Sequence, residues 1–282
     1  MKLLAWNCQG IGGDLTFDNL MEQCSLHTPD MVILLETKNK SRRYGYLKRR
    51  MGMEYMHAVE PCGIGGGMCL FWRDVSHVSL MKYADFVIEV KIWDSCKQCF
   101  WRLFAIYAST DAKKKEKKQW VALSGCLEKE SDRCLLIGDF NDILSNDEKE
   151  GGNYRTLASL RDFRDFVARN ELIDLGYDGY PFTWRNNREV MPIQQRLDRG
   201  LASLGWYELY PDTKILHVVL EGSDHAMLVL SMEKQWVRRG RQFTYDARCG
   251  KLEECRDLVA KEWGGGVKGD LMLTGVVRNL RD

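Results

Sequence analysis

The chain has 282 residues, of which 45% are hydrophobic and 11% aromatic, so it can bury one large core. Its 41 basic and 40 acidic residues give a formal net charge of +1, which excludes a strong overall attraction to nucleic acid and leaves that task to local basic patches. The first residues run directly into a strand-like segment, and no apolar stretch is long enough to cross a bilayer. We therefore expect a soluble intracellular protein, nuclear or cytoplasmic, that is not secreted and acts as a monomer.

Seven short apolar runs, each bounded by polar residues or glycine, predict β-strands. They span residues 2–6, 31–35, 68–72, 87–93, 103–107, 134–137 and 227–231. Helical periodicity is strongest over residues 157–169 and weaker over residues 17–25 and 115–127. Strands joined by both hairpins and helices favour an α/β (α+β) fold of the four-layer sandwich type, in which two packed mixed sheets are flanked by helices.

The composition divides the chain into two parts. Residues 1–232 are expected to form the sandwich domain, and residues 233–282 a basic, partly helical tail. Within the domain, the glycine cluster at residues 63–67 precedes Met68 and Cys69, where a phosphate-binding loop would need a Lys and a Ser or Thr. We therefore interpret the cluster as a flexible turn that leads into a strand.

Ten cysteines are scattered through the chain, and several, such as Cys69 and Cys134, lie within apolar runs. This distribution favours reduced, buried thiols over a disulfide scaffold. Cys96 and Cys99 form one CxxC between two strand-like runs. Because zinc needs about four ligands and no second pair follows, a hairpin tip is the preferred interpretation and a metal site the alternative.

Polar side chains follow several of the predicted strands, at the point where the backbone leaves the core. Because such strand ends can share one crevice, the set predicts a functional site, and carboxylate, amide and imidazole groups suit a hard divalent cation and a phosphate ester. The set consists of Asn7, Glu36, Tyr107, Asp139, Asn141, Asp198, Asp224 and His225.

Glu36 ends a buried strand, so its carboxylate is well placed to hold Mg²⁺, with Asn7 supplying a neutral oxygen. The alternatives are a solvated charge at the strand end for Glu36 and a turn residue for Asn7.

Asp139 and Asn141 are separated by one residue, so in extended geometry both side chains would leave the same face of the chain. Asp139 would orient or deprotonate an attacking water, and Asn141 would donate a hydrogen bond to a phosphate oxygen. An Asx turn is the alternative, and Phe140 between them should point into the core.

Asp198 is available to fix the tautomer of His225 and raise its pKa, as required if the imidazolium is to stabilise a pentacovalent phosphate. The other histidines lack such company and are interpreted as surface or packing residues: His27, His57, His77 and His217.

Contacts with nucleic acid are expected from side chains around this site. Trp184 could stack on a splayed base next to Thr183, although packing in the core is an equally ordinary use of tryptophan. Basic runs could follow a phosphate backbone, and ordinary solvated charge is the alternative. The basic candidates are Lys38, Arg42, Arg43, Lys113 and Lys114.

The collinear motifs WNCQG, LLETK, GGGMCLFW, LLIGDFNDIL, DEKEGG, LIDLGYDGYPFTW, QRLDRGL and GSDHAMLVL resemble the endonuclease/exonuclease/phosphatase (DNase I-like) superfamily. The similarity covers residues 1–232 and is closest to the apurinic-type endonuclease domain of plant LINE (non-LTR) retrotransposons. It implies a Mg²⁺-dependent enzyme, with Mn²⁺ as a possible substitute, that acts on DNA. The tail resembles the segment that joins such a domain to a reverse transcriptase, which the parent element would encode downstream.

The resemblance also implies roles for individual residues. Glu36 matches the principal metal ligand, Asp224 a residue that assists the metal or water, and His225 the residue that contacts the scissile phosphate. Asp198 matches the partner of that histidine. Tyr107 matches a tyrosine whose hydroxyl approaches the phosphate, although a strand-end tyrosine also commonly covers a core edge.

Two departures argue against a specialist for abasic sites. Thr110 stands where apurinic endonucleases have a phosphate-binding Asn, and Gln9 where they have an Asp near the metal. The resemblance to LINE-type endonucleases implies a metal-dependent phosphodiesterase that nicks DNA and leaves a 3′-hydroxyl. The alternatives are a phosphatase or an RNA deadenylase or exonuclease of the same superfamily, and a catalytically idle relic that only binds nucleic acid.

Overall fold

The computed structural model describes residues 1–40, 44–61, 65–73, 77–111, 115–128, 133–186 and 191–233. All of these residues belong to one compact unit, Met1–Gln235. A second unit, Trp236–Asp282, lies outside the described residues, as does almost all of the predicted tail.

The first large sheet has seven strands, and β1 (Lys2–Asn7) lies near its centre. β1 pairs in parallel with β2 and antiparallel with β16, so the end of β1 lies beside the end of β2 and the start of β16. The strand order is β11 (Asp178–Gly179), β15 (Lys214–Val218), β16 (Met227–Ser231), β1, β2 (Met31–Leu35), β4 (Met68–Trp72) and β3 (Tyr55–Val59).

The second large sheet has six strands, and β7 and β8 form its parallel pair. Its order is β10 (Leu172–Asp174), β14 (Asp198–Ser203), β8 (Cys134–Asp139), β7 (Cys99–Tyr107), β6 (Val87–Asp94) and β5 (His77–Ala84). A small third sheet joins β12 (Trp184–Arg185), β13 (Gln194–Gln195) and β9 (Lys149–Glu150).

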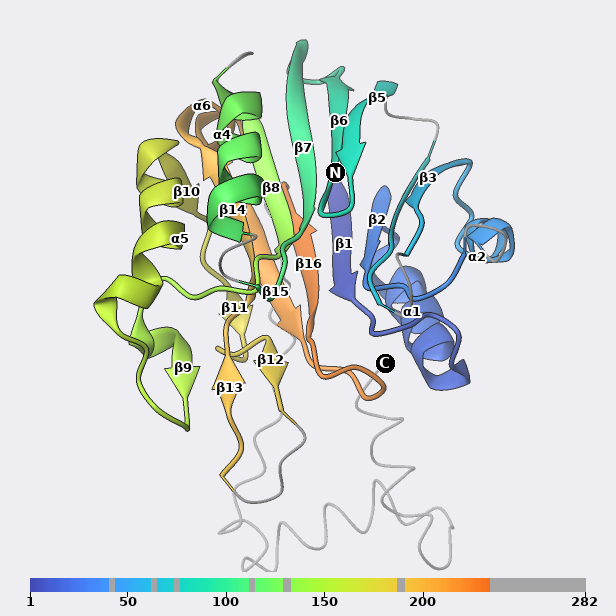
Figure 1. Cartoon of the computed structure of the whole chain (residues 1–282). Helices are drawn as coiled ribbons and strands as arrows, with labels where there is room; N and C mark the ends of the chain where they lie inside the picture. Colours follow the sequence, from blue (N-terminus) through green and yellow to red (C-terminus); the bar gives the residue numbers. More distant parts are fainter. Residues whose placement is uncertain are drawn as a thin grey trace, which may run out of the picture. The chain divides into compact units, whose positions relative to one another are not determined.

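Helices cover the outer faces of the two large sheets (Figure 1). α1 (Asp14–His27) and α2 (Tyr44–Arg50) lie against the seven-stranded sheet, whereas α4 (Val121–Leu127) and α5 (Leu157–Arg169) lie against the six-stranded sheet. A π-helical segment, η2 (Lys115–Trp120), leads into α4; a 3-10 turn, η3 (Asn146–Glu148), and α6 (Leu204–Leu209) complete the set. The hydroxyl of Thr156 caps α5 by accepting from the backbone N–H of Ser159.

The alternation of side chains along the strands divides the core into layers. In β1, Leu3 and Ala5 join a cluster between the two sheets, whereas Leu4 and Trp6 join one under α1 and α2. The six-stranded sheet divides in the same way, with Phe163 of α5 in its outer cluster. These layers confirm the predicted four-layer α/β sandwich.

The predicted strands and the three predicted helical segments are all present. The CxxC forms the predicted hairpin tip between β6 and β7, and the cysteines of the described residues carry no disulfide. The sequence analysis did not foresee α2, α6, β14, β15, the edge strands β3 and β5, or the short strands. None of the helices in the described ranges is long and apolar enough to span a membrane.

Candidate active site

One edge of the two-sheet sandwich collects the predicted functional residues. Asn7, Tyr107 and Asp139 are the last residues of β1, β7 and β8. In these three strands the odd-numbered side chains point into the hydrophobic cluster between the two sheets. Because side chains alternate along a strand, these three residues, which also have odd numbers, lie on that same inner face. Because β1 and β7 each pair in parallel with a neighbour, strand ends from both sheets carry polar groups into the mouth of this inter-sheet layer.

Asp198, Asp224 and His225 do not follow strands, and that part of the prediction was wrong. Asp198 is the first residue of β14 and pairs directly with Asp139, because β14 runs antiparallel to β8. Asp224 and His225 precede β16, which runs antiparallel to β1. The start of an antiparallel strand lies beside the end of its neighbour, so these residues still reach the same edge.

His225 lies at the centre of a buried polar cluster. Its Nδ1 is 2.9 Å from Oδ2 of Asp198, and its Nε2 is 3.4 Å from Nδ2 of Asn7 and 3.9 Å from Oδ2 of Asp139. Asn7 in turn donates to Oδ2 of Asp139 over 2.9 Å. All four residues are at most 5% exposed.

Burial and charge act in opposite directions on this cluster. Burial alone lowers the pKa of His225, but the negative charges of Asp198 and Asp139 outweigh it and raise that pKa above its ordinary value. Burial, reinforced by Asp198, raises the pKa of Asp139. With this raised pKa, both ring nitrogens of His225 are protonated at neutral pH. The Nε2–H then lies beside another donor, Nδ2 of Asn7, and the nearest carboxylate oxygens, of Asp139 and Asp224, are 3.9 Å away, beyond hydrogen-bond distance.

The loop that carries His225 is anchored by residues absent from the predicted site. Trp6 donates from Nε1 to the carbonyl of His225 over 3.1 Å. The hydroxyl of Ser223 donates to the carbonyl of Asn7 and accepts from the N–H of His225. No sequence signal beyond their proximity to Asn7 and His225 indicated these contacts.

Asn141 reaches Asp139 through a turn, so the expectation of extended geometry was wrong. The φ angle of Asn141 is 49°, and its N–H donates to Oδ1 of Asp139 over 2.8 Å, which is an Asx turn. Its Nδ2 donates to Oδ2 of Asp139 and to the carbonyl of Ala108. Phe140 is fully buried, as predicted.

Glu36 immediately follows β2 and has a φ of 50°. Its Oε1 lies 3.0 Å from Nζ of Lys38, so Lys38 contacts a predicted site residue. Burial, followed by the carboxylates of Glu36 and Asp139, raises the pKa of the Tyr107 hydroxyl. Glu36 is therefore near Tyr107, which stays a neutral donor at physiological pH.

Asp224 keeps one oxygen free of hydrogen bonds. Its Oδ2 accepts from Nε1 of Trp184 over 2.9 Å. Its Oδ1 is buried, has no hydrogen-bond partner among the described residues, and lies 3.9 Å from Nε2 of His225. Such an orphaned carboxylate oxygen is what a cation ligand shows in the absence of its cation.

Two sets of side chains compete as cation ligands. Asp139, Asp198 and His225 offer ligand atoms within 4.8 Å of one another. His225 is a poor candidate, because both ring nitrogens carry protons when its pKa is raised and Nδ1 is committed to Asp198. By donor chemistry alone, the orphaned oxygen of Asp224 is better suited to a hard cation, as is the carboxylate of Glu36, which is paired with Lys38 in this structure.

Thr183 and Trp184 have different surroundings, although they are adjacent. Thr183 is 2% exposed, and its Oγ1 accepts from the N–H groups of Leu197 and Asp198, both over 2.9 Å. A side chain committed in this way positions Asp198 and is not available to a polymer substrate. Trp184 lines a cavity of about 410 Å³ together with Phe182, Arg185, Asp224 and His225.

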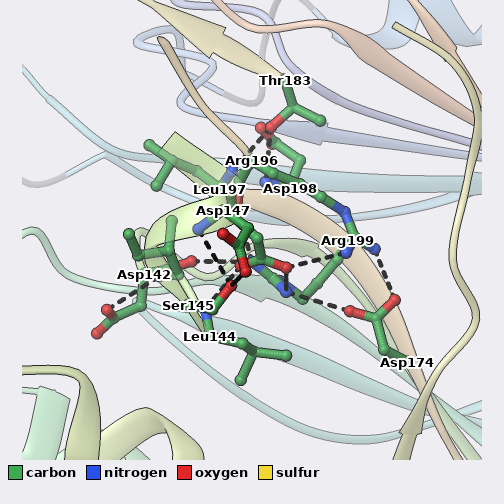
Figure 2. A network of polar contacts seen from close by, with 12 residues as sticks. Asp142, Leu144, Ser145, Asp147, Asp174, Thr183, Arg196, Leu197, Asp198 and Arg199 are labelled. Atoms are coloured by element: carbon green, nitrogen blue, oxygen red, sulfur yellow. Dashed lines mark hydrogen bonds and ion pairs between the residues drawn. The ribbon is translucent and has the colours of Figure 1, made fainter. Parts of the chain in front are cut away.

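A charged network supports Asp198 from the opposite side of β14 (Figure 2). Arg199 is fully buried and donates to both oxygens of Glu148, over 2.9 and 2.8 Å, and to Asp174 over 3.1 Å. Arg196 contacts the same two carboxylates over 3.0 and 2.6 Å. The network was missed by the sequence analysis, because its partners are far apart in the chain.

The remaining basic candidates give no structural information. Arg42, Arg43, Lys113 and Lys114 lie outside the described residues.

Several solved structures have a similar fold. NExo, a 3′ phosphatase from Neisseria solved with a product DNA hairpin, superposes with a TM-score of 0.63 and 18% identity over 83% of this chain and 99% of its own. The endonuclease domain of TRAS1, a telomere-specific non-LTR retrotransposon, gives 0.62 and 14% over 83% and 99%. The AP endonuclease LMAP from Leishmania major gives 0.65 and 15% over 81% and 86%. At these identities the likeness shows the fold alone.

The sequence itself is also informative. No curated protein matches it. A family model, however, matches residues 4–225, which include the whole polar cluster from Asn7 to His225. The chain therefore belongs to the Endonuclease/Exonuclease/phosphatase family.

Proposed function

We propose that the protein is a divalent-metal-dependent endonuclease that nicks DNA by hydrolysis and leaves a 3′-hydroxyl. The observation that carries the proposal is the buried arrangement of His225 between Asp198 and the Asn7–Asp139 pair. It combines an imidazolium whose Nε2–H has no acceptor with a carboxylate of raised pKa. A phosphodiester needs both a donor to its developing negative charge and an acceptor for the proton of water.

Each residue of the cluster has a defined part in the reaction. Asp139 orients the water and takes its proton as the water oxygen bonds to phosphorus. The bond from phosphorus to O3′ breaks with the electron pair on O3′, which takes a proton from solvent water and becomes the 3′-hydroxyl, and Asp139 returns its proton to solvent. His225 donates from Nε2 to a non-bridging oxygen, and Asp198 keeps the imidazole charged and oriented.

Asn141 and Tyr107 complete the polar surface around the phosphate. Asn141 is held by Asp139 and by the carbonyl of Ala108, so its amide is fixed beside the reacting centre. The hydroxyl of Tyr107 is neutral because of its raised pKa and serves as a second donor. The hydrogen bond from Tyr107 strengthens as negative charge builds up on the phosphate. Asn141 already uses both N–H bonds of its amide on Asp139 and Ala108, so it holds Asp139 in place and would donate to the phosphate only by giving up one of these contacts.

Glu36 and Asp224 would hold the cation, with Oδ1 of Asn7 as a neutral ligand. The fit rests on the orphaned Oδ1 of Asp224 and on an all-oxygen donor set, which suits Mg²⁺ or Mn²⁺. When bound, the ion supplies neutralisation of phosphate charge.

Trp184 and the basic side chains would contact DNA. Trp184 and Arg185 line the cavity beside His225, where a base or a phosphate could lie. Lys38 lies at the mouth of the site beside Glu36, and we include Arg42, Arg43, Lys113 and Lys114 as further backbone contacts. The motif resemblance to LINE-type endonucleases supports an origin in a mobile element whose reverse transcriptase is encoded downstream.

A plasmid-nicking assay tests the proposal. Supercoiled plasmid is incubated with Mg²⁺, with Mn²⁺ and with EDTA, using wild type, Asp139→Asn and Asp178→Asn. Asp178 is 56% exposed and, within the described part of the chain, forms an ion pair only with the exposed Lys214, so the same chemical change there serves as the matched control. Wild type and the control should produce relaxed circles with metal, and Asp139→Asn should be slower by at least about 100-fold.

The same enzyme preparations are assayed on a phosphoinositide and on poly(A). Turnover of either of these without plasmid nicking would replace the endonuclease proposal by a phosphatase or deadenylase. DNA binding without turnover of any substrate would indicate a relic that has lost catalysis.

A further inference from the structure

The loop after β2 has an unusual backbone. Glu36 and Lys38 have φ angles of 50° and 53°, in the left-handed region that residues with a Cβ disfavour. Thr37 lies between them and is fully buried. Two left-handed residues persist only where surrounding contacts impose that conformation. The contacts of the buried Thr37 between them therefore determine the direction of the Glu36 side chain.

Every polar group of Thr37 has a partner. Its N–H donates to the carbonyl of Gly67 over 3.1 Å, and its carbonyl accepts from the N–H of Ile11 over 3.1 Å and from Nδ2 of Asn39 over 2.8 Å. Its Oγ1 is 2.6 Å from the hydroxyl of Tyr44, another fully buried residue. These contacts tie Thr37 to the loop after β1, to the loop before β4 and to α2.

Gly66 and Gly67, the end of the glycine cluster, form one side of this arrangement. The carbonyl of Gly66 accepts from the N–H of Lys38 over 3.0 Å, next to the contact between Gly67 and Thr37. Gly67 has a φ of 87°, and a Cβ at this position would lie 2.6 Å from Oγ1 of Thr37. Gly67 is therefore required by close approach, and the interpretation of the cluster as only a flexible turn misses this contact.

We infer that Thr37, enclosed by Gly67 and Tyr44, is a positioning residue that sets the carboxylate of Glu36 for cation binding. The inference rests on the proposed function in one respect, namely that Glu36 is a cation ligand. Thr37 itself touches neither substrate nor ion. Its role is to keep Glu36 in a left-handed conformation that the residue would not adopt by itself, so that the carboxylate is in place before the ion arrives.

The experiment measures Mn²⁺ binding to the whole protein by electron paramagnetic resonance, with thermal unfolding recorded for every variant. Gly67→Ala introduces the clash with Thr37. Gly52→Ala is the matched control, because Gly52 has a φ of 65° and a Cβ there meets nothing within 4 Å. Thr37→Val removes the hydroxyl at nearly constant volume, and Thr37→Ser restores it.

Gly67→Ala and Thr37→Val should each raise the dissociation constant for Mn²⁺ by about tenfold or more. Gly52→Ala and Thr37→Ser should stay within about threefold of wild type, with unfolding temperatures comparable to those of the paired variants. Equal weakening by Gly67→Ala and Gly52→Ala, or unchanged binding in Thr37→Val, would overturn the inference. If Gly67→Ala fails to fold, the comparison of Thr37→Val with Thr37→Ser tests the inference by itself.

Glu36→Gln distinguishes a failure of the positioning role from a failure of the proposed endonuclease activity. Unchanged Mn²⁺ binding in Glu36→Gln would remove Glu36 from the cation site and the inference with it. Weakened binding in Glu36→Gln and Thr37→Val, combined with no nicking by wild type, would leave the positioning role intact and refute only the endonuclease.

Discussion

Two buried clusters of charge meet at β14 and differ in how their charges are balanced. On the outward side of the strand, Arg196 and Arg199 face Glu148 and Asp174. On the inward side, Asp198 joins a cluster in which several carboxylates surround one imidazole. The two clusters are separated by a single peptide unit.

The outward quartet is electrically neutral, and each carboxylate oxygen accepts at least one hydrogen bond. Glu148 accepts from both arginines and from the N–H of Leu144, and Asp174 accepts from both arginines and from the N–H of Gly176. Burial by itself raises the pKa of Asp174, but Arg196 and Arg199 outweigh it and hold that pKa below its ordinary value. This is the pattern of a structural network.

The inward cluster is imbalanced. The pKa values of both Asp139 and His225 are raised, and Oδ1 of Asp224 has no hydrogen-bond partner in the described part of the chain. The comparison teaches that buried charge alone does not mark a catalytic site. A carboxylate oxygen without a hydrogen-bond partner and a carboxyl pKa raised instead of lowered distinguish the site from its scaffold, in which the described atoms without partners are the Nε atoms of Arg196 and Arg199.

The largest expected effect is on the scaffold. Arg199→Met removes a fully buried cation and leaves the partly buried carboxylates of Glu148 and Asp174 with half of their countercharge, so the free energy of unfolding should fall by about 3 kcal/mol. Urea denaturation measures it, and Lys214→Met, which breaks an exposed pair with Asp178, is the control with no expected change. A loss in Arg199→Met as small as in the control would remove the distinction between the two clusters.

Asp198→Asn should have the opposite effect, namely a large loss of nicking with the fold preserved. The imidazole loses its main countercharge, so nicking should slow by about 100-fold, and the pKa of His225 followed by NMR should fall. The fold should persist, because the outward quartet is untouched. Unaltered His225 titration in this variant would contradict the role of Asp198.

Acid should remove the stabilisation that Asp174 contributes to the quartet. The pKa of Asp174 is lowered in the folded state, so its stabilisation is complete above the unfolded pKa of about 4 and is lost as the pH falls through the folded value. Urea denaturation of wild type and Asp174→Asn between pH 7 and pH 3 should show a difference that narrows below about pH 4. The change is at most about 1.4 kcal/mol per pH unit. A constant difference across this range would exclude Asp174 as the source.

The smallest expected effect is on cation binding by Asp224, whose Oδ1 has no hydrogen-bond partner among the described residues. Trp184→Phe keeps an aromatic ring at this position but removes the indole N–H that donates to Oδ2 of Asp224. Mn²⁺ binding should weaken by roughly fivefold, equivalent to about 1 kcal/mol, because Asp224 gains rotational freedom. Phe182→Leu, in the same cavity but without a hydrogen bond to Asp224, serves as the control. Stronger binding in Trp184→Phe would show that the tryptophan restrains Asp224 in an unproductive orientation.

The elements predictable from the sequence are those whose apolar residues mark the core directly. Residues 31–35 and 157–169 have the run length or the periodicity of their structures, and both appear with these bounds. β14 was missed, because it begins Asp-Arg-Gly, which is typical of a turn. Its burial becomes understandable only once Glu148 and Asp174 neutralise Arg199, and their positions in the chain give no sign of that contact.

The candidate site was predictable in composition and less so in geometry. The pattern of polar residues indicated Asn7, Asp139 and His225, which the fold brings together, although His225 precedes its strand instead of following one. Their arrangement depends on which strands pair and in which direction, and a single chain does not encode that in local patterns. Thr183 positions Asp198 by accepting a hydrogen bond from its backbone N–H, and no pattern of residues in the sequence predicts this contact.

The position of β14 between two clusters makes its register unusually sensitive. Side chains alternate along a strand, so a shift by one residue would turn Arg199 toward the imidazolium of His225 and Asp198 toward Glu148 and Asp174. Like charges would then be buried together on both faces at once. A single-residue insertion or deletion within this strand should therefore abolish folding and chemistry together, whereas most strands would suffer only a displaced apolar face.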